Sequence, residues 1–225
     1  MLEMANARSL EAVEVWARRE LDAKNLARET ALRVSRELVR ASANSIRAVH
    51  RRQFEQAEAL LERASALNRE LASLERDAPD VFWAGYVQDA QKELVEACCT
   101  LALVRGVALP DPSALGVAPA AFLNGLAEAA GELRRYVLDK LRRGEVAGCE
   151  ELLSEMDDIY SLLVTLDYPD ALTGGLRRTT DSTRGILEKT RGDLNLALRR
   201  EGLVVALQTA KRGRVAGGRS DGRGL

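Results

Sequence analysis

The sequence is poor in aromatic residues, histidine and cysteine, and each shortage excludes a class of protein. Aromatic side chains make up 4% of the 225 residues, which disfavours a β-sandwich or barrel and favours helices packed through alanine and leucine. The single histidine, His50, excludes a nuclease site built from two histidines of one subunit. The three cysteines contain no Cys-x-x-Cys pair, so we expect reduced thiols rather than a disulfide framework or a zinc site.

Long apolar runs and an excess of charge of one sign are also missing. No stretch approaches the roughly 20 apolar residues of a membrane-spanning helix, and Glu3, Arg8 and Glu11 stand where a signal peptide would have its apolar core. We therefore expect a cytoplasmic protein with no membrane partner. The 33 basic and 34 acidic residues give a net charge of −1, so any attraction for nucleic acid must come from a local surface.

Helix-forming residues dominate what remains. The segment from Ser9, a favourable capping residue, to about Arg51 is rich in Ala, Leu, Arg and Glu and holds neither Gly nor Pro. Prolines and glycines separate the later helical segments, and no alternation of β-branched residues indicates a strand. The sequence predicts an all-α fold, an antiparallel bundle of about six to seven long helices. We expect the helices to cover residues 9–51, 53–76, 80–105, 119–143, 145–167 and 176–200.

The last residues differ in composition from the remainder. We expect residues 1–210 to form a single helical domain. From Lys211 the sequence KRGRVAGGRSDGRGL is basic, rich in glycine and too polar to bury. This composition predicts a disordered tail over residues 211–225.

One expected helix carries a carboxylate within an apolar run. Residues 94–104 read LVEACCTLALV, in which Glu96 is the one charged residue, and Glu93 lies one turn earlier on the same helical face. Because a buried carboxylate is costly without a partner, it needs an arginine, a shared proton or a divalent cation. The alternative is an ordinary ion pair at the edge of the bundle.

The next long helix carries two acids beside very small residues. Glu128 and Glu132 share a face with Gly125, which allows another backbone to approach closely. The alternative is that EAAGE consists of helix-favouring Ala and Glu on a solvated face. If this helix faces the previous one, several carboxylates converge that cannot all stay ionised without a cation. Mg²⁺ suits such oxygen ligands and serves phosphodiester chemistry, with Mn²⁺ as a substitute.

A basic stripe occupies the end of the first helix. Residues 33–52 contain six arginines against one glutamate, a local charge of +5. Such a stripe suits contact with phosphates, and the alternative is a solvated face balanced by acids of neighbouring helices. The arginines that fall near one helical face are Arg36, Arg40, Arg47 and Arg51.

Four segments together resemble the translin/Trax family. SANSIRAVHR at residues 42–51 is similar to the end of the first Trax helix, and KELVEA at residues 92–97 to the Trax helix with a Glu-x-x-Glu pair. GELRR at residues 131–135 resembles a block of both translin and Trax. The segment from Tyr168 to Leu194 is similar to the C-terminal part of family members, notably the prokaryotic single-subunit versions. The likeness covers about residues 27–200.

The resemblance implies an all-α protein that assembles into a closed, hollow homo-oligomer, often an octamer, and binds single-stranded RNA or DNA. Translin and Trax together form a Mg²⁺-dependent endoribonuclease. Matched to this sequence, the Glu-x-x-Glu pair falls on Glu93 and Glu96. The second acid pair falls on Glu128 and Glu132, with Glu128 in place of the family's Asp. Translin lacks the first pair and the acid at position 128, so the resemblance favours a catalytic, Trax-like subunit.

These observations give one main expectation and two alternatives. In the main one Glu93, Glu96 and Glu128 bind Mg²⁺, Glu132 is a further ligand or general base, and the stripe arginines hold phosphates. The first alternative is a translin-like protein that binds single strands without cutting them. The second is a structural oligomer whose arginines are neutralised by neighbouring acids.

Overall fold

The computed structural model describes the backbone of residues 2–217 and the side chains of residues 10–203. Within that part of the chain every regular element is a helix, which confirms the predicted all-α fold. The long helices are α1 (Leu2–His50), α2 (Phe54–Ala72), α5 (Gly85–Arg105), α7 (Pro119–Arg142), α8 (Cys149–Val164) and α10 (Leu176–Gly217). Between them lie the one-turn helices α3 (Leu74–Asp77), α4 (Pro79–Phe82), α6 (Pro112–Leu115) and α9 (Asp170–Thr173).

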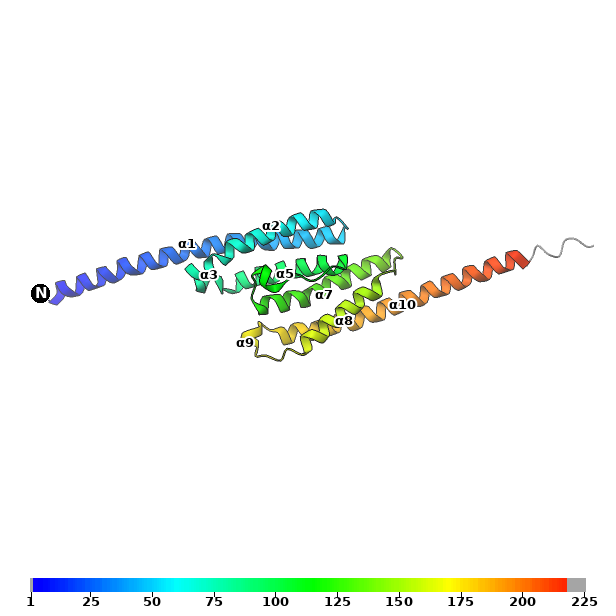
Figure 1. Cartoon of the computed structure of the whole chain (residues 1–225). Helices are drawn as coiled ribbons and strands as arrows, with labels where there is room; N and C mark the ends of the chain where they lie inside the picture. The colour runs from blue at the N-terminus through cyan, green and yellow to red at the C-terminus, as the bar shows by residue number, and fades with distance from the viewer. Residues whose placement is uncertain (1, 218–225) are drawn as a thin grey trace, which may run out of the picture.

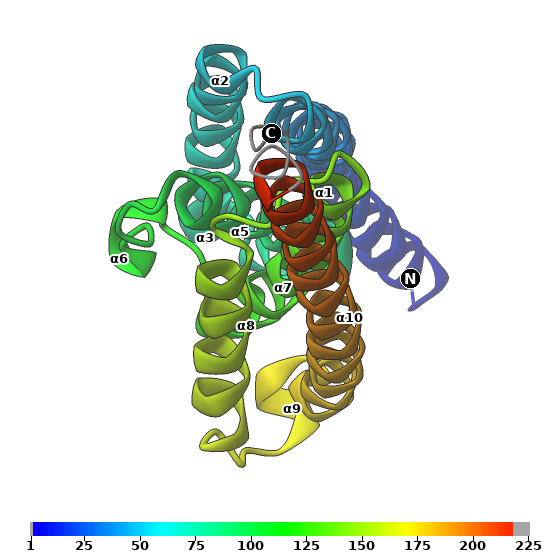
Figure 2. The ribbon, with the colours of Figure 1, turned by 90° about the vertical axis from the view of Figure 1, so that its right-hand side faces the viewer.

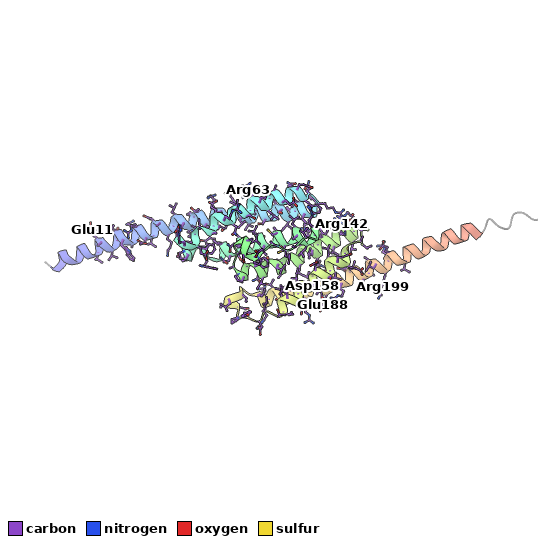
Figure 3. All side chains as sticks on the ribbon, viewed as in Figure 1. Glu11, Arg63, Arg142, Asp158, Glu188 and Arg199 are labelled. Carbon is purple, nitrogen blue, oxygen red and sulfur yellow. The ribbon has the colours of Figure 1, made fainter. Side chains whose placement is uncertain are left out.

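The long helices form an elongated bundle of three layers. Helices α1 and α2 make one outer layer, α5 and α7 the middle one, and α8 and α10 the other outer layer (Figure 1, Figure 2). Charged side chains such as Arg63 on α2 and Asp158 on α8 lie on the outside (Figure 3). None of the helices described between residues 2 and 217 combines the length and the apolar character of a membrane-spanning segment.

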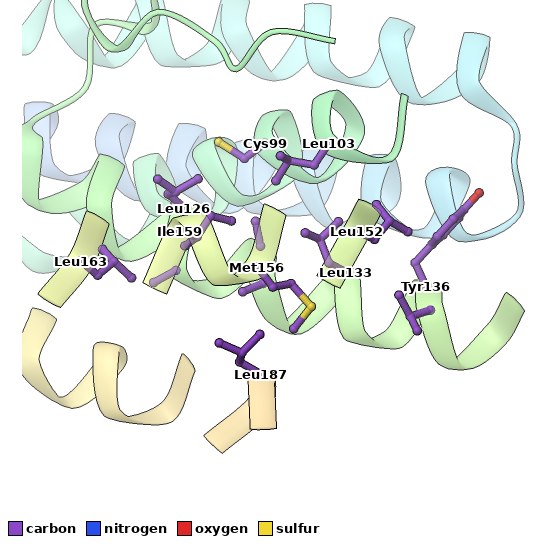
Figure 4. Close-up of a cluster of buried hydrophobic side chains, with 14 of the residues drawn as sticks. Cys99, Leu103, Leu126, Leu133, Tyr136, Leu152, Met156, Ile159, Leu163 and Leu187 are labelled. Atoms are coloured by element: carbon purple, nitrogen blue, oxygen red, sulfur yellow. The ribbon is translucent and has the colours of Figure 1, made fainter. Parts of the chain in front are cut away.

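Neighbours α5 and α7 run in the same direction, whereas α1 and α2 are antiparallel (Figure 1, Figure 4). The connection between α5 and α7, which contains α6, carries the chain back along the bundle before α7 begins. The parallel course brings acids that occur in the same order on the two helices to matching heights.

Helix α5 contributes to each of the three hydrophobic clusters that the described residues form, the smallest of which joins its Leu101 to Ala48, Val49 and Ala57. Val87 and Leu94 pack with α1, α2 and α4. Val95, Cys99 and Leu103 pack in the second core with α7, α8 and α10, as Figure 4 shows for part of that cluster. This central position explains why the run 94–104 is apolar on nearly every side.

Several helix boundaries differ from those expected. Residues 79–82 form the separate turn α4, so α5 begins at Gly85. Helix α8 begins only at Cys149, because Gly144 and Gly148 adopt a positive φ and hold the preceding segment in turns.

Helices α1 and α10 extend beyond the bundle at opposite ends (Figure 1). Helix α10 continues to Gly217, so the first seven residues of the expected tail 211–225 are helical, and the others lie outside the described residues. Residues 201–217 contain no proline to end the helix. The projecting part of α1 exposes large apolar side chains, among them Leu10, Trp16, Leu21 and Leu26.

Candidate metal centre and nucleic-acid interface

Gly125 sets the distance between the two middle helices. A Cβ atom at this position would lie 2.5 Å from the main-chain oxygen of Lys92 and 2.7 Å from the Cβ of Val95. These separations are too short for any side chain, so glycine is required for α7 to approach α5 this closely. The contact lies one turn before the first acid of α7.

Three of the four expected acids meet just beyond this contact. Glu93 and Glu96 from α5 and Glu128 from α7 each offer an oxygen, and these atoms lie within 4.8 Å of one another. All three side chains are partly buried. The two helices therefore face each other as the acidic pattern required.

The electrostatics of this group disfavour three negative charges. Burial, followed by the charges of Glu93 and Glu128, raises the pKa of Glu96 to about 8. Burial and the charge of Glu128 likewise raise the pKa of Glu93, although Lys92 acts in the opposite direction. The cluster thus contains more negative charge than its surroundings neutralise.

Lys92 is a member of the site that sequence reasoning missed. Its Nζ donates a hydrogen bond of 2.8 Å to Oε1 of Glu128 on the facing helix. Burial opposes the charged amine, but the bond to Glu128 and the nearby acids outweigh it and raise the Lys92 pKa. The spacing of Lys92 and Glu96 indicates a shared face of α5, but no sequence signal shows the contact across to α7.

Glu132 lies outside the group of three and bonds to the only histidine instead. Nε2 of His50, at the end of α1, donates to Oε2 of Glu132. A nitrogen of Arg135 lies 3.6 Å from the same oxygen. The hydrogen bond from His50 lowers the Glu132 pKa despite partial burial, which weakens this carboxylate as a general base. His50, with a side chain only 6% exposed, holds Glu132 in place.

The donor set fits a hard divalent cation. It consists of carboxylate oxygens alone, which is the ligand type that Mg²⁺ and Mn²⁺ prefer over softer metals. A cation would also offset the charges of Glu93 and Glu128, which add to the effect of burial in raising the Glu96 pKa.

The basic stripe lies on the exposed side of α1, with Arg51 just beyond the end of the helix. Among the side chains that the structure describes, Arg36, Arg40, Arg47 and Arg51 are exposed and form no ion pair with an acid. Nearby acids are already engaged, since Glu37 contacts Arg33 and Arg63, and Glu70 contacts Arg33.

A groove between α1 and α2 includes part of this stripe. It has a volume of about 500 Å³, and its lining includes Arg36, Arg40, Asn44 and Leu60. The groove presents unpaired guanidinium groups to solvent, which suits the binding of phosphates.

Fold and site define a helical bundle with a half-buried carboxylate cluster and a basic outer groove. No family model matches the chain. A protein of Methanocaldococcus jannaschii, itself uncharacterised, is 32% identical over 182 residues, which cover 78% of this chain and 81% of that protein.

Solved structures give a fuller description. AfC3PO in a complex with duplex RNA is 36% identical, with a TM-score of 0.76, and the match covers 82% of this chain and 95% of that one. A crystal structure of AfC3PO is 37% identical at the same TM-score, over 82% and 96% of the two chains. Apo-NeC3PO, 19% identical with a TM-score of 0.69 over 84% and 96%, shares the fold. The chain belongs to the translin/Trax family, to which the C3PO proteins belong.

Proposed function

We propose that this protein binds RNA and is a Mg²⁺-dependent endoribonuclease that acts within a closed homo-oligomer. The observation that carries the proposal is the meeting of Glu93, Glu96 and Glu128 at the contact between α5 and α7. RNA as the ligand is supported by family membership and by the relative AfC3PO, whose structure was solved with duplex RNA.

The proposed roles follow from the contacts of each side chain. Glu93, Glu96 and Glu128 would hold the cation, which when bound polarises the phosphate and activates a water. Glu132, fixed by His50 and of lowered pKa, is better suited to a ligand or positioning role than to that of a general base. The unpaired stripe arginines would hold the RNA phosphates and so orient the strand.

Self-association is supported by the projecting end of α1. Trp16 and Leu26 are 59% and 70% exposed. Contact of such large apolar side chains with water is unfavourable, so a patch of them indicates a surface that another protein covers. A second copy of the chain would cover them. A closed shell of such copies would surround the RNA and exclude larger structures from the acidic site.

Cleavage assays test the proposal directly. Labelled single-stranded RNA, single-stranded DNA of equal sequence and duplex RNA are incubated with the protein in Mg²⁺, Mn²⁺ or EDTA. We expect RNA cutting that requires the cation and is lost in Glu96→Gln, which removes the charge while keeping the shape. The matched control is Glu155→Gln, which alters an exposed acid on α8 and leaves cutting intact. If Glu96→Gln and Glu155→Gln cut RNA equally well, the active site does not include Glu96.

A second candidate is a binding protein without catalysis. The bond between Lys92 and Glu128 favours it, because such a pair is also found in purely structural contacts between helices. In that case wild-type protein retains RNA on a filter and cuts none of it in either cation.

A further inference from the structure

The ammonium group of Lys92 occupies one side of the acidic cluster. Its Nζ lies 2.8 Å from Oε1 of Glu128, and the two side chains are 25% and 34% exposed. Glu128 is also one of the three acids whose oxygens lie within 4.8 Å of one another. One carboxylate is therefore shared between the lysine and the position a cation would take.

A divalent cation and this ammonium cannot both be close neighbours of Glu128 without repelling each other. At such separations, in a partly buried site, the repulsion between like charges is only weakly screened by solvent. Cation binding must therefore displace Lys92 or be weakened by it.

Lys92 has a second acid within reach on its own helix. Asp89 precedes it by three residues, so the two lie on the same face one turn apart, and Asp89 is exposed. The side chain of Lys92 has four flexible methylenes, which allow the ammonium to move from Glu128 towards Asp89.

We propose that Lys92 is a built-in counter-ion that occupies Glu128 in the cation-free protein and turns to Asp89 when a divalent cation binds. This inference rests on the proposed cation site. It assigns Lys92 as a positioning residue that sets how much cation the site requires. It also predicts that the site stays folded without a cation, because one negative charge is already neutralised.

Calorimetric titration of the full-length protein with MnCl₂ tests the competition without any measurement of activity. Lys92→Met keeps the length of the side chain and removes its charge, so we expect Mn²⁺ to bind about tenfold more tightly than to wild type. Lys92→Arg keeps the charge and should stay near the wild-type Kd. The matched control Lys189→Met, an exposed lysine on α10, leaves the Kd unchanged.

A second variant tests the other half of the proposal and does not depend on the folding of Lys92→Met. Asp89→Asn deprives the displaced ammonium of its partner, so Mn²⁺ should bind several-fold more weakly. The counter-ion role is wrong if Lys92→Met binds Mn²⁺ no more tightly than wild type, or if Asp89→Asn binds Mn²⁺ as tightly as wild type. In either case the cation site itself stands. If wild type and every variant bind no Mn²⁺, both the cation site and this inference are wrong.

Discussion

Glu96 is the residue whose protonation is most sensitive to the state of the site. Its pKa lies near 8 in the folded, cation-free protein, against an ordinary value of 4.5. Between these two pH values the folded protein holds a proton that the unfolded chain has released. The free energy of unfolding therefore falls as pH rises from 4.5 to 8.

Glu96→Gln should remove this pH dependence. In EDTA at pH 8 we expect the variant to be more stable than wild type by up to about 4 kcal/mol, and the difference should vanish towards pH 4.5. Urea denaturation between pH 5 and 8.5 measures it, with Glu155→Gln as the control that follows wild type. Parallel pH profiles of wild type and Glu96→Gln would contradict the raised pKa.

At the scale of single residues, the sequence indicated the acids of the site but not the side chains that bond to them. Spacing along two helices predicted that Glu93, Glu96 and Glu128 would meet if the helices faced each other, and the resemblance to Trax pointed to the same residues. The bonds of Lys92 to Glu128 and of His50 to Glu132 join residues 36 and 82 positions apart. No periodicity within one helix contains information about such contacts across helices.

At the scale of elements, the contact between α5 and α7 depends on one missing side chain. In Gly125→Ala the added Cβ would meet the backbone oxygen of Lys92, which cannot move aside as a flexible side chain would. We expect stability to fall by about 1–3 kcal/mol and the response to Mn²⁺ to weaken, because the two acidic helices must separate. Urea denaturation and calorimetric titration measure the two effects.

Gly131→Ala is the matched control on the same helix. Its Cβ would lie 3.8 Å from the nearest atom, Cδ1 of Ile186, an ordinary contact. Because alanine favours helix over glycine, this variant should be as stable as wild type or more so. Similar destabilisation in both variants would show that the tight approach at Gly125 is unimportant.

If the basic stripe on α1 holds RNA phosphates, RNA binding should depend on the salt concentration. Replacing Arg36 and Arg40 by Gln should weaken RNA binding and reduce its dependence on salt by about 0.7 log units per decade for each phosphate that is no longer bound. Filter binding over a series of KCl concentrations measures the slope. Arg184→Gln is the control, because this arginine on α10 is already paired with Glu188. An unchanged slope in the double variant would place the RNA elsewhere.

The elements themselves were largely predictable, because Ala, Leu, Arg and Glu dominate long segments between prolines and glycines. The relative directions of the helices were harder to predict. The loop around residues 106–118 was visible in the sequence, but its length permits either a direct turn or a return along the bundle. In the structure this loop carries the chain back along the bundle, and α5 and α7 are therefore parallel.

At the scale of the whole molecule, the exposed apolar side chains of α1 predict association between copies. Wild type should have a mass in solution that is a multiple of 24.6 kDa. Trp16→Glu should lower that mass, because a charge would then enter an apolar contact. Light scattering after size exclusion measures it, and Asn25→Glu adds the same charge to an exposed polar position on the same helix. Equal masses for both variants would exclude this surface from the interface.

The packing of α5 in the two larger hydrophobic clusters has a consequence for fluctuations of the fold. A local opening of the α1–α2 layer leaves α5 packed against α7, and an opening of the α8–α10 layer leaves it packed against α1. We therefore expect α5 to be the last of the helices to lose its packing when either outer layer opens locally. The acids it carries would keep their spacing while the projecting ends of α1 and α10 fray and reform.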